Sequence, residues 1–581
     1  MVYHMTENIL SSNIIKELSL KADEFLIDHD HEKLKELMDL LLEDEYTFES
    51  LVDEAQFYYM LGNCCQELFS YHTLDWFSDE LSKSVIFFRK ALYAVQKIEQ
   101  PTDEELYLQS CIETNLGNDL STQGRAFCCI PFWDNAFERK QNPVSIISKA
   151  NHELFVAHCV YDPGHRNYHY FIAYQLIILG LENQDNLYPE QKSAYSVDGN
   201  LMRFKAWFEN HYKLEDFDDF ELFEGQSDTK KQSEYLKWCG DNRLFLNDLN
   251  DVSVSEIVYQ DIMTLPSFSQ KLNPSLLMHE ELMYHGNFDE LKNDYCYARY
   301  LTFSAKNMPS GEKHFFNDTY PHVNDMSHSF TGLKASHYKS AFRTLYSIFD
   351  KIAYFINRFF DLNSIEHDRK ISFDNIFREL KNTKKWKPHR KLKESQNCFI
   401  HALFYILKDI RDVKDSTSVC CWLDPDAKAF SEIRNAIEHR SLKIVDDFGH
   451  SLIHSDIERR QLQAEQKNSE VDNYLACLEE VYDEIALAKK AQNIDLKVEL
   501  EAKKQLLASK LCQVQAELYE QQKLSSHSML IKESEFESRL MTLMALARNS
   551  IMYLSLAIHR EEQINADKDL LKVPLEVPLK Y

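Results

Sequence analysis

The chain has 581 residues, a hydrophobic content of 44% and a formal net charge of −28. A chain of this length exceeds what one hydrophobic core supports, so we expect two or three domains. The acidic balance excludes a broad nucleic-acid-binding surface, which would be basic, but it allows a small local basic site. Only 12 Gly and 13 Pro occur, which disfavours the many turns of an all-β fold and favours an all-α protein.

Cysteine usage and hydropathy indicate a reduced, soluble protein. The 13 Cys are scattered, odd in number and free of any Cys-x-x-Cys spacing. Residues 1–20 carry acids and no long apolar stretch, and no segment approaches the 18 uncharged apolar residues of a membrane span. These features predict a cytoplasmic protein with no membrane partner.

Residues 1–215 are predicted to form helical hairpins. Two stretches, 55–63 and 111–118, each run an apolar helical face into Leu-Gly-Asn. The glycines, Gly62 and Gly117, let two paired helices approach closely. The pattern resembles irregular tetratricopeptide-type repeats, whose concave surface suits a protein partner or a trigger ligand.

Residues 216–330 are predicted to form a junction or extension. Acidic residues gather in its first part, and residues 238–251 are rich in Asn and Asp. These residues favour Asx turns and helix caps. The spacing and glycine of a calcium-binding EF-hand loop are absent, so we expect a structural turn there.

Residues 331–581 are predicted to form a helical bundle. Apolar residues with a 3.6-residue period predict a helix at 335–360. Further helices are predicted at 399–410, at 427–439 after Pro425, and at 537–558, which is rich in apolar residues. The charged segment 457–522 contains almost no Gly or Pro, which predicts an extended helix or a helical hairpin. Within it, residues 494–500 alternate with a period of two, so a short strand there stays open.

The most reactive short segment is Ile-Arg-Asn-Ala-Ile-Glu-His-Arg at residues 433–440. It places a permanent cation (Arg434), an amide (Asn435) and an acid/base that titrates near neutral pH (His439) within about one and a half helical turns. RNA cleavage by transesterification needs a base for the 2′-hydroxyl, stabilisation of the phosphorane charge and an acid for the 5′-oxygen. These three side chains supply such groups without a metal.

This Arg-x4-His arrangement resembles the signature of the HEPN superfamily. The resemblance covers roughly residues 231 to 560. Within the superfamily, the chain resembles a bacterial subfamily in which the HEPN domain is fused to tetratricopeptide-like repeats. The resemblance implies a helical bundle and a metal-independent endoribonuclease in which Arg434, Asn435 and His439 are catalytic. It also implies a homodimer or higher homo-oligomer in which two copies of the motif build one cleft.

Helical geometry is consistent with a shared site. Residues 435 and 439 lie about 40° apart around a helix, whereas Arg434 lies about 140° from His439. Arg434 must therefore act from a neighbouring face. An alternative is that Arg434 and Glu438 form an ordinary surface pair at positions i and i+4.

Supporting residues are predicted around the motif. Besides Glu438 and Arg440 within it, the helix at 335–360 carries Arg343, Asp350 and Lys351 in an otherwise apolar segment. Asp350 is a candidate to orient a histidine or an arginine. The alternative for these residues is a set of ion pairs within or between helices.

One basic run stands out in this acidic chain. Residues 381–393 contain seven Lys or Arg, no acid and one Trp. Cations follow phosphates and an aromatic ring stacks on an unpaired base, so the run predicts RNA binding, with a solvated loop as the alternative. The candidate RNA-binding residues are Lys384, Lys385, Trp386, Lys387, Arg390 and Lys391.

No cofactor or metal site is predicted. His450 and His454 have helical spacing, as have His165 and His169, but no nearby Cys or carboxylate completes a convincing ligand set. Phosphate-binding loops, dinucleotide fingerprints and serine-hydrolase elbows are also absent from the sequence.

These observations predict an endoribonuclease that acts on single-stranded RNA or tRNA, serving as a defence toxin controlled by its helical repeats. A second hypothesis is a scaffold with an inactive HEPN part that binds RNA or protein. A third, nucleotide transfer with a partner chain, lacks a transferase motif here.

Overall fold

The structure is a computed structural model. It describes residues 9–42, 46–72, 75–187, 189–225, 227–266, 278–309, 314–324, 328–362, 371–377, 389–410, 425–448, 455–491, 493–524, 528–565, 577 and 579.

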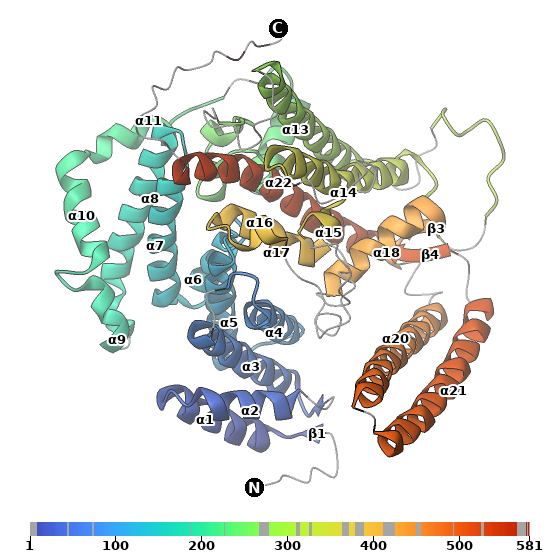
Figure 1. Cartoon of the computed structure of the whole chain (residues 1–581). Coiled ribbons are helices and arrows are strands. Elements are labelled where there is room, and N and C mark those ends of the chain that lie inside the picture. Colours follow the sequence, from blue (N-terminus) through green and yellow to red (C-terminus); the bar gives the residue numbers. More distant parts are fainter. Residues whose placement is uncertain are drawn as a thin grey trace. The chain divides into compact units, whose positions relative to one another are not determined.

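The described residues are mainly helical, and their strands form two short parallel pairs (Figure 1). This confirms the predicted all-α fold class. The chain divides into two compact units. The first consists of Met1–Tyr300, Thr344–Lys428 and Leu543–Tyr581, and the second of Leu301–Arg343 and Ala429–Thr542.

The first unit opens with a short parallel strand pair and a series of helices. The strands are β1 (Ile9–Leu10) and β2 (Thr47–Phe48). The helices are α1 (Ser12–Ile27), α2 (His31–Leu41), α3 (Leu51–His72), α4 (Asp79–Gln96), α5 (Asp103–Thr122), α6 (Ile130–Lys140), α7 (Pro143–Cys159) and α8 (Pro163–Glu182).

Glycines set the close packing between consecutive helices in this series. A Cβ atom at Gly62 of α3 would lie 2.5 Å from the Phe88 ring of α4. A Cβ atom at Gly117 of α5 would lie 2.6 Å from the Trp133 indole nitrogen of α6. Real Cβ atoms essentially never lie so close, so a side chain at either position would force the Phe88 or Trp133 ring to shift. Both glycines therefore allow the close approach of paired helices that the Leu-Gly-Asn pattern predicts.

Further helices of the first unit are shorter or are shared with the second unit. The short ones are α9 (Pro189–Lys192), α10 (Asn200–His211), α11 (Asp218–Glu221), α12 (Lys230–Asp241), α15 (Phe373–Ile376), α16 (Arg390–Lys393) and α17 (Cys398–Ile410). Those with residues in both units are α13 (Met278–Lys306), α14 (Leu333–Phe359), α18 (Pro425–His439) and α22 (Glu533–Ile564).

The segment rich in Asn and Asp forms a structural turn, as predicted. The Asn247 side chain caps a short 3₁₀ helix at Asp248–Asp251, and the Asn250 amide donates to the Gly240 carbonyl at 3.1 Å. Asp251 forms a buried bidentate ion pair with Arg548 of α22, at 3.0 and 2.8 Å. The turn therefore positions Asp251 to pair with the buried guanidinium of Arg548.

A second buried ion-pair network joins α4 to α17. The carboxylate of Asp409 accepts from Arg89 at 2.8 Å and contacts Arg125 at 2.6 Å. Burial of this carboxylate opposes its charge, but the two guanidinium groups lower the pKa of Asp409 to about 2. Loss of either guanidinium would leave the buried Asp409 carboxylate less compensated, so this network favours the observed pairing of α4 with α17.

The second unit contains a parallel strand pair that the sequence did not predict. Strand β3 (Ser441–Val445) pairs in parallel with β4 (Ser528–Lys532) in the register Ser441 to Ser528 and Val445 to Lys532. On the other edge of β3, the Phe330 amide donates to the Ile444 carbonyl at 2.9 Å. Parallel strands need a long crossover connection, and the described part of this connection includes two long helices.

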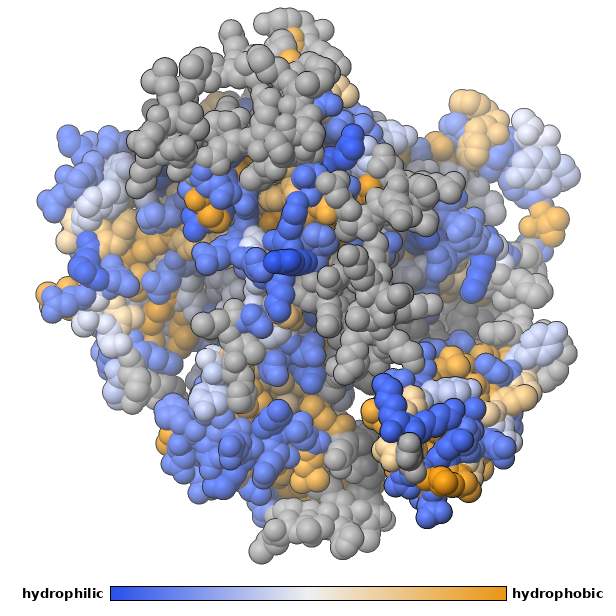
Figure 2. All heavy atoms as spheres, viewed as in Figure 1, coloured by the Kyte–Doolittle hydropathy of each residue, from blue (hydrophilic) through white to orange (hydrophobic). Residues whose placement is uncertain are grey.

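Those two helices, α20 (Ser455–Lys490) and α21 (Ile494–Leu524), form a helical hairpin, which is one of the two forms predicted for this segment (Figure 1). Val481, Ile485, Ala488 and Leu500 pack between them, and Lys467 of α20 contacts Glu517 of α21 at 3.0 Å. Hydrophilic and hydrophobic side chains are mixed on the visible face of the hairpin (Figure 2). Residues 494–500 are helical, so the alternative of a strand there is wrong.

Among the residues described, one helix, α22, has the length and composition of a membrane span, with a mean hydropathy of 1.3 over its most apolar window. Within the structure, 83% of that window is buried. The apolar character of α22 is therefore used for packing inside the protein.

One buried acid in the first unit is expected to make stability depend on pH. Asp119 of α5 accepts a hydrogen bond from Gln66 of α3 at 2.7 Å, and its second oxygen has no partner among the described residues. Burial raises the pKa of Asp119 to about 7. Because the pKa of Asp119 is higher in the folded than in the unfolded protein, protonation of this acid stabilises the fold. The stabilisation is complete below about pH 4 and is lost as the pH rises through 7.

We therefore expect Asp119→Asn, which imitates the protonated acid, to be more stable than the wild type at pH 8 and about equally stable at pH 4. The difference at pH 8 should be about 4 kcal/mol, since the pKa is raised by roughly three units and each unit is worth about 1.4 kcal/mol. Thermal denaturation across this pH range measures it. An equal difference at both pH values would contradict the buried-acid account.

Candidate active site

The motif lies at the C-terminal end of α18. Buried side chains of this helix recur at Phe430, Ile433 and Ala436, and Phe430 contacts Phe342 of α14. On a helical wheel, Asn435 and His439 lie about 40° apart, on the side away from these buried positions. The apolar period of the helix therefore turns the amide and the imidazole toward solvent.

His439 is the last residue of α18, and its side chain is exposed. No residue in the described part of the chain donates to or accepts from its ring. The imidazole is thus accessible to a ligand, whereas burial in a dry core would have excluded chemistry at this residue.

Arg434 and Asn435 are partly buried neighbours of the imidazole along the helix. The guanidinium of Arg434 donates to the Asn435 side-chain oxygen at 3.4 Å. The two side chains thus form one polar group on the flank of α18.

Arg343 of α14 contacts the motif directly. Its Nε lies 2.9 Å from the Glu438 carboxylate, and its Nη2 donates to the Ile437 carbonyl at 3.0 Å. The second bond satisfies one of the carbonyls left open at the end of a helix. The first neutralises Glu438, the one acid inside the motif.

Further positive charge lies beside the motif. Lys339, one turn before Arg343 on α14, donates to the Leu442 carbonyl of β3 at 2.5 Å. Burial and the neighbouring charge of Arg343 lower the pKa of Lys339. Arg440, the last residue of the motif, is exposed, and Lys443 lies in β3. Four cations, Lys339, Arg343, Arg440 and Lys443, therefore lie on or next to the C-terminal end of α18.

The other two candidates on α14 contact different helices. Asp350 accepts from the Phe373 amide of α15 at 3.1 Å. Lys351 pairs with Glu290 and Asp294 of α13. Both belong to the first unit. For Lys351 this is the inter-helix ion pair that the sequence left open as an alternative.

The basic run is described only at its end. Lys384, Lys385, Trp386 and Lys387 lie outside the described residues. Arg390 and Lys391 are exposed on α16, and Lys391 donates to the Asp361 carbonyl at 2.5 Å. RNA binding by this run stays a prediction.

Of the four histidines with helical spacing, two form ion pairs with carboxylates and two lie outside the described residues. His450 and His454 are outside the described residues. His169 uses both ring nitrogens, contacting Glu153 at 2.7 Å and Asp248 at 2.9 Å, while His165 contacts Asp248 at 2.7 Å. Although burial opposes its charge, the two carboxylates raise the pKa of His169 to about 10. The imidazole ring of His169 is thus a buried structural cation.

The part of the chain that carries α18 matches a known protein family. Residues 278–469 match the model of the LA2681-like HEPN family. The chain contains a C-terminal HEPN region. This region runs from the start of α13 into α20 and includes all of α18 and its motif. No curated protein and no solved structure matches the chain.

Sequence reasoning missed Lys339 as a neighbour of the motif. Its signal was present, because Lys339 and Arg343 are four residues apart on one predicted helix and so share a face. The pattern alone did not say which element that face packs against.

We expect Arg343→Ala to weaken RNA binding by the HEPN region because Glu438 would then lie uncompensated beside the motif. The pair is 49% and 37% exposed, so solvent screening limits its coupling to about 0.2–1 kcal/mol, or up to roughly fivefold in affinity. Fluorescence anisotropy with labelled RNA, in a His439→Ala background, measures the change.

The double variant Arg343→Ala/Glu438→Gln should recover most of the lost affinity. Arg358→Ala, on the same helix, is the matched control and should bind as the parent does. Failure of Glu438→Gln to rescue binding would show that Arg343 does not act through that carboxylate.

Proposed function

We propose that the HEPN region is a metal-independent endoribonuclease that cleaves RNA by attack of a 2′-hydroxyl on the adjacent phosphate. The observation that carries this proposal is the exposed imidazole of His439 at the end of the helix that also carries the Arg434 and Asn435 pair, within the matched region. The cations Lys339, Arg343 and Arg440 add an anion-attracting surround.

In the proposed reaction, a base removes the proton of the 2′-hydroxyl, and the 2′-oxygen bonds to phosphorus. The 5′-oxygen leaves and takes a proton from an acid. The products end in a 2′,3′-cyclic phosphate and a 5′-hydroxyl. Arg434 stabilises the charge on the phosphorane, His439 transfers protons, and Asn435 positions the phosphate or the imidazole.

We expect His439→Ala to lower the rate of RNA cleavage in the presence of EDTA by at least about 100-fold. A positioned general acid or base contributes roughly 10² to 10⁴ to a rate, and EDTA removes metal-dependent contaminants. The assay follows end-labelled RNA on a denaturing gel.

His322→Ala is the matched control, because His322 is an exposed histidine of the same matched region. Its cleavage rate should equal that of the wild type. Equal cleavage by wild type and His439→Ala would remove the proposal.

The reaction needs one group that accepts a proton from the 2′-hydroxyl and another that donates a proton to the 5′-oxygen. Two copies of His439, one neutral and one protonated, supply both groups more simply than one copy does. We propose on this ground that two chains pair with their motifs facing one another. Paired symmetric subunits are the commonest homo-oligomers.

We expect the activity per wild-type chain to fall when wild-type and His439→Ala chains are allowed to exchange partners. With about a ninefold excess of His439→Ala, random pairing leaves roughly one wild-type chain in ten with a wild-type partner, so the activity per wild-type chain falls about tenfold. An unchanged activity per wild-type chain would contradict a shared cleft.

The helical series of the first unit has a proposed regulatory role. A surface built from paired helices suits a protein or trigger ligand, and control by such a trigger fits a toxin that damages RNA in defence. Single-stranded RNA or tRNA is the proposed substrate, since unpaired RNA exposes its bases and backbone.

The second candidate function is a scaffold that binds RNA without cutting it. The cationic surround of α18 supports binding as well as it supports catalysis. This alternative predicts RNA affinity that survives His439→Ala, together with no cleavage by the wild type.

A further inference from the structure

Two histidines and a glutamate meet in the N-terminal part of the first unit, away from the HEPN match. His29 and His31 flank the turn between α1 and α2, and Glu67 lies on α3. His31 Nε2 is 3.2 Å and His29 Nδ1 is 3.7 Å from Glu67 Oε1. One donor atom from each of the three residues lies within 4.8 Å of the others.

These separations fit a tetrahedral metal ion. Ligands about 2.0–2.1 Å from zinc lie about 3.3–3.4 Å from one another around a tetrahedron. The two measured distances to Glu67 bracket that value. The set of two imidazoles and one carboxylate is one that zinc accepts, whereas calcium and magnesium prefer oxygen ligands alone.

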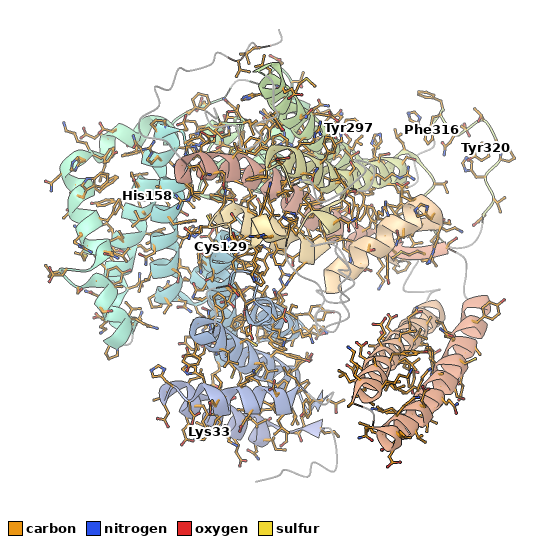
Figure 3. All side chains as sticks on the ribbon, in the orientation of Figure 1. Lys33, Cys129, His158, Tyr297, Phe316 and Tyr320 are labelled. Atoms are coloured by element: carbon orange, nitrogen blue, oxygen red, sulfur yellow. The ribbon has the colours of Figure 1, made fainter. Side chains whose placement is uncertain are left out.

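The surrounding contacts hold His31 for such a role. Its ring stacks on Tyr71 of α3, with centroids 3.6 Å apart and planes 7° apart, and its side chain is 11% exposed. The acid between the two histidines, Asp30, is already engaged: it caps α2 and contacts Lys33 at 2.6 Å. Lys33 is labelled on α2 in Figure 3.

His29 occupies a backbone conformation that costs free energy. Its φ is 53°, in the left-handed region at the end of α1. Glycine is the usual residue in this position after a helix, and a side chain there costs about 1 kcal/mol or more. A strained histidine that directs its ring nitrogen toward Glu67 is consistent with a functional ligand.

We propose that His29, His31 and Glu67 bind one zinc ion per chain, with the fourth position left to water. His29 is 76% exposed, so water and the ion have access. The bound ion would tie the turn between α1 and α2 to α3 and would stabilise this end of the first unit. This proposal is independent of the proposed ribonuclease activity.

The test compares zinc binding by the full-length protein and two ligand variants, after chelator treatment and desalting. His29→Gly removes a ligand and relieves the strained backbone, so it should fold at least as stably as the wild type without metal. Glu67→Gln removes the carboxylate with little change of shape. His158→Ala is the matched control, because His158 is an exposed histidine of α7 (Figure 3).

Zinc titration against a competing chromogenic chelator should show one more bound equivalent for the wild type and His158→Ala than for His29→Gly and Glu67→Gln. Loss of a ligand should weaken zinc binding at this site at least tenfold. Mutation of a residue that only hydrogen-bonds to a metal ligand already lowers metal affinity roughly 10- to 100-fold. Zinc should raise the melting temperature of the wild type and leave that of His29→Gly unchanged. Cysteine thiols contribute equally to all four proteins.

Equal zinc stoichiometry and affinity in all four proteins would overturn the proposal. So would an equal zinc-induced rise in melting temperature for the wild type and His29→Gly. In either case, His31 and Glu67 would form only a surface ion pair.

Discussion

The parallel pairing of β3 with β4 is the constraint on which the candidate active site depends. α18 ends at His439, and β3 begins two residues later at Ser441. The ladder between Ser441 and Ser528 therefore anchors the chain directly after the motif. Lys339 adds a bond to the Leu442 carbonyl, and Arg343 closes the end of α18. His439 stays exposed on an otherwise fixed helix end.

The cations at the motif make an RNA substrate compatible with the acidic net charge of the chain. The net charge of −28 belongs to the whole molecule, but screening restricts electrostatic effects to about 8–10 Å at ordinary salt concentrations. At the motif itself, Lys339 bonds to the Leu442 carbonyl and Arg343 neutralises Glu438. The lowered pKa of Lys339 reflects its burial and the neighbouring charge of Arg343.

The sequence predicted what depends on local periodicity. The all-α class follows from the scarcity of Gly and Pro, and α14 from its 3.6-residue apolar period. The helices α17, α18 and α22 were also predicted, and the match to the HEPN family model contains the motif. Contacts across long separations were not predictable. The β3 to β4 pair joins segments separated by the whole hairpin, and the approach of His29 and His31 to Glu67 depends on how α1 to α3 pack. Residues 494–500 show that a period of two does not decide against a helix within a charged, breaker-free segment.

The most direct test of the central claim examines the atom that attacks. RNA cut by the wild type in EDTA should end in a 2′,3′-cyclic phosphate and a 5′-hydroxyl. The same RNA with a single 2′-deoxy nucleotide at the cleavage position should remain intact there, because the proposed nucleophile is absent. Equal cleavage of the deoxy-substituted RNA at that position, or products with 3′-hydroxyl ends, would contradict the account.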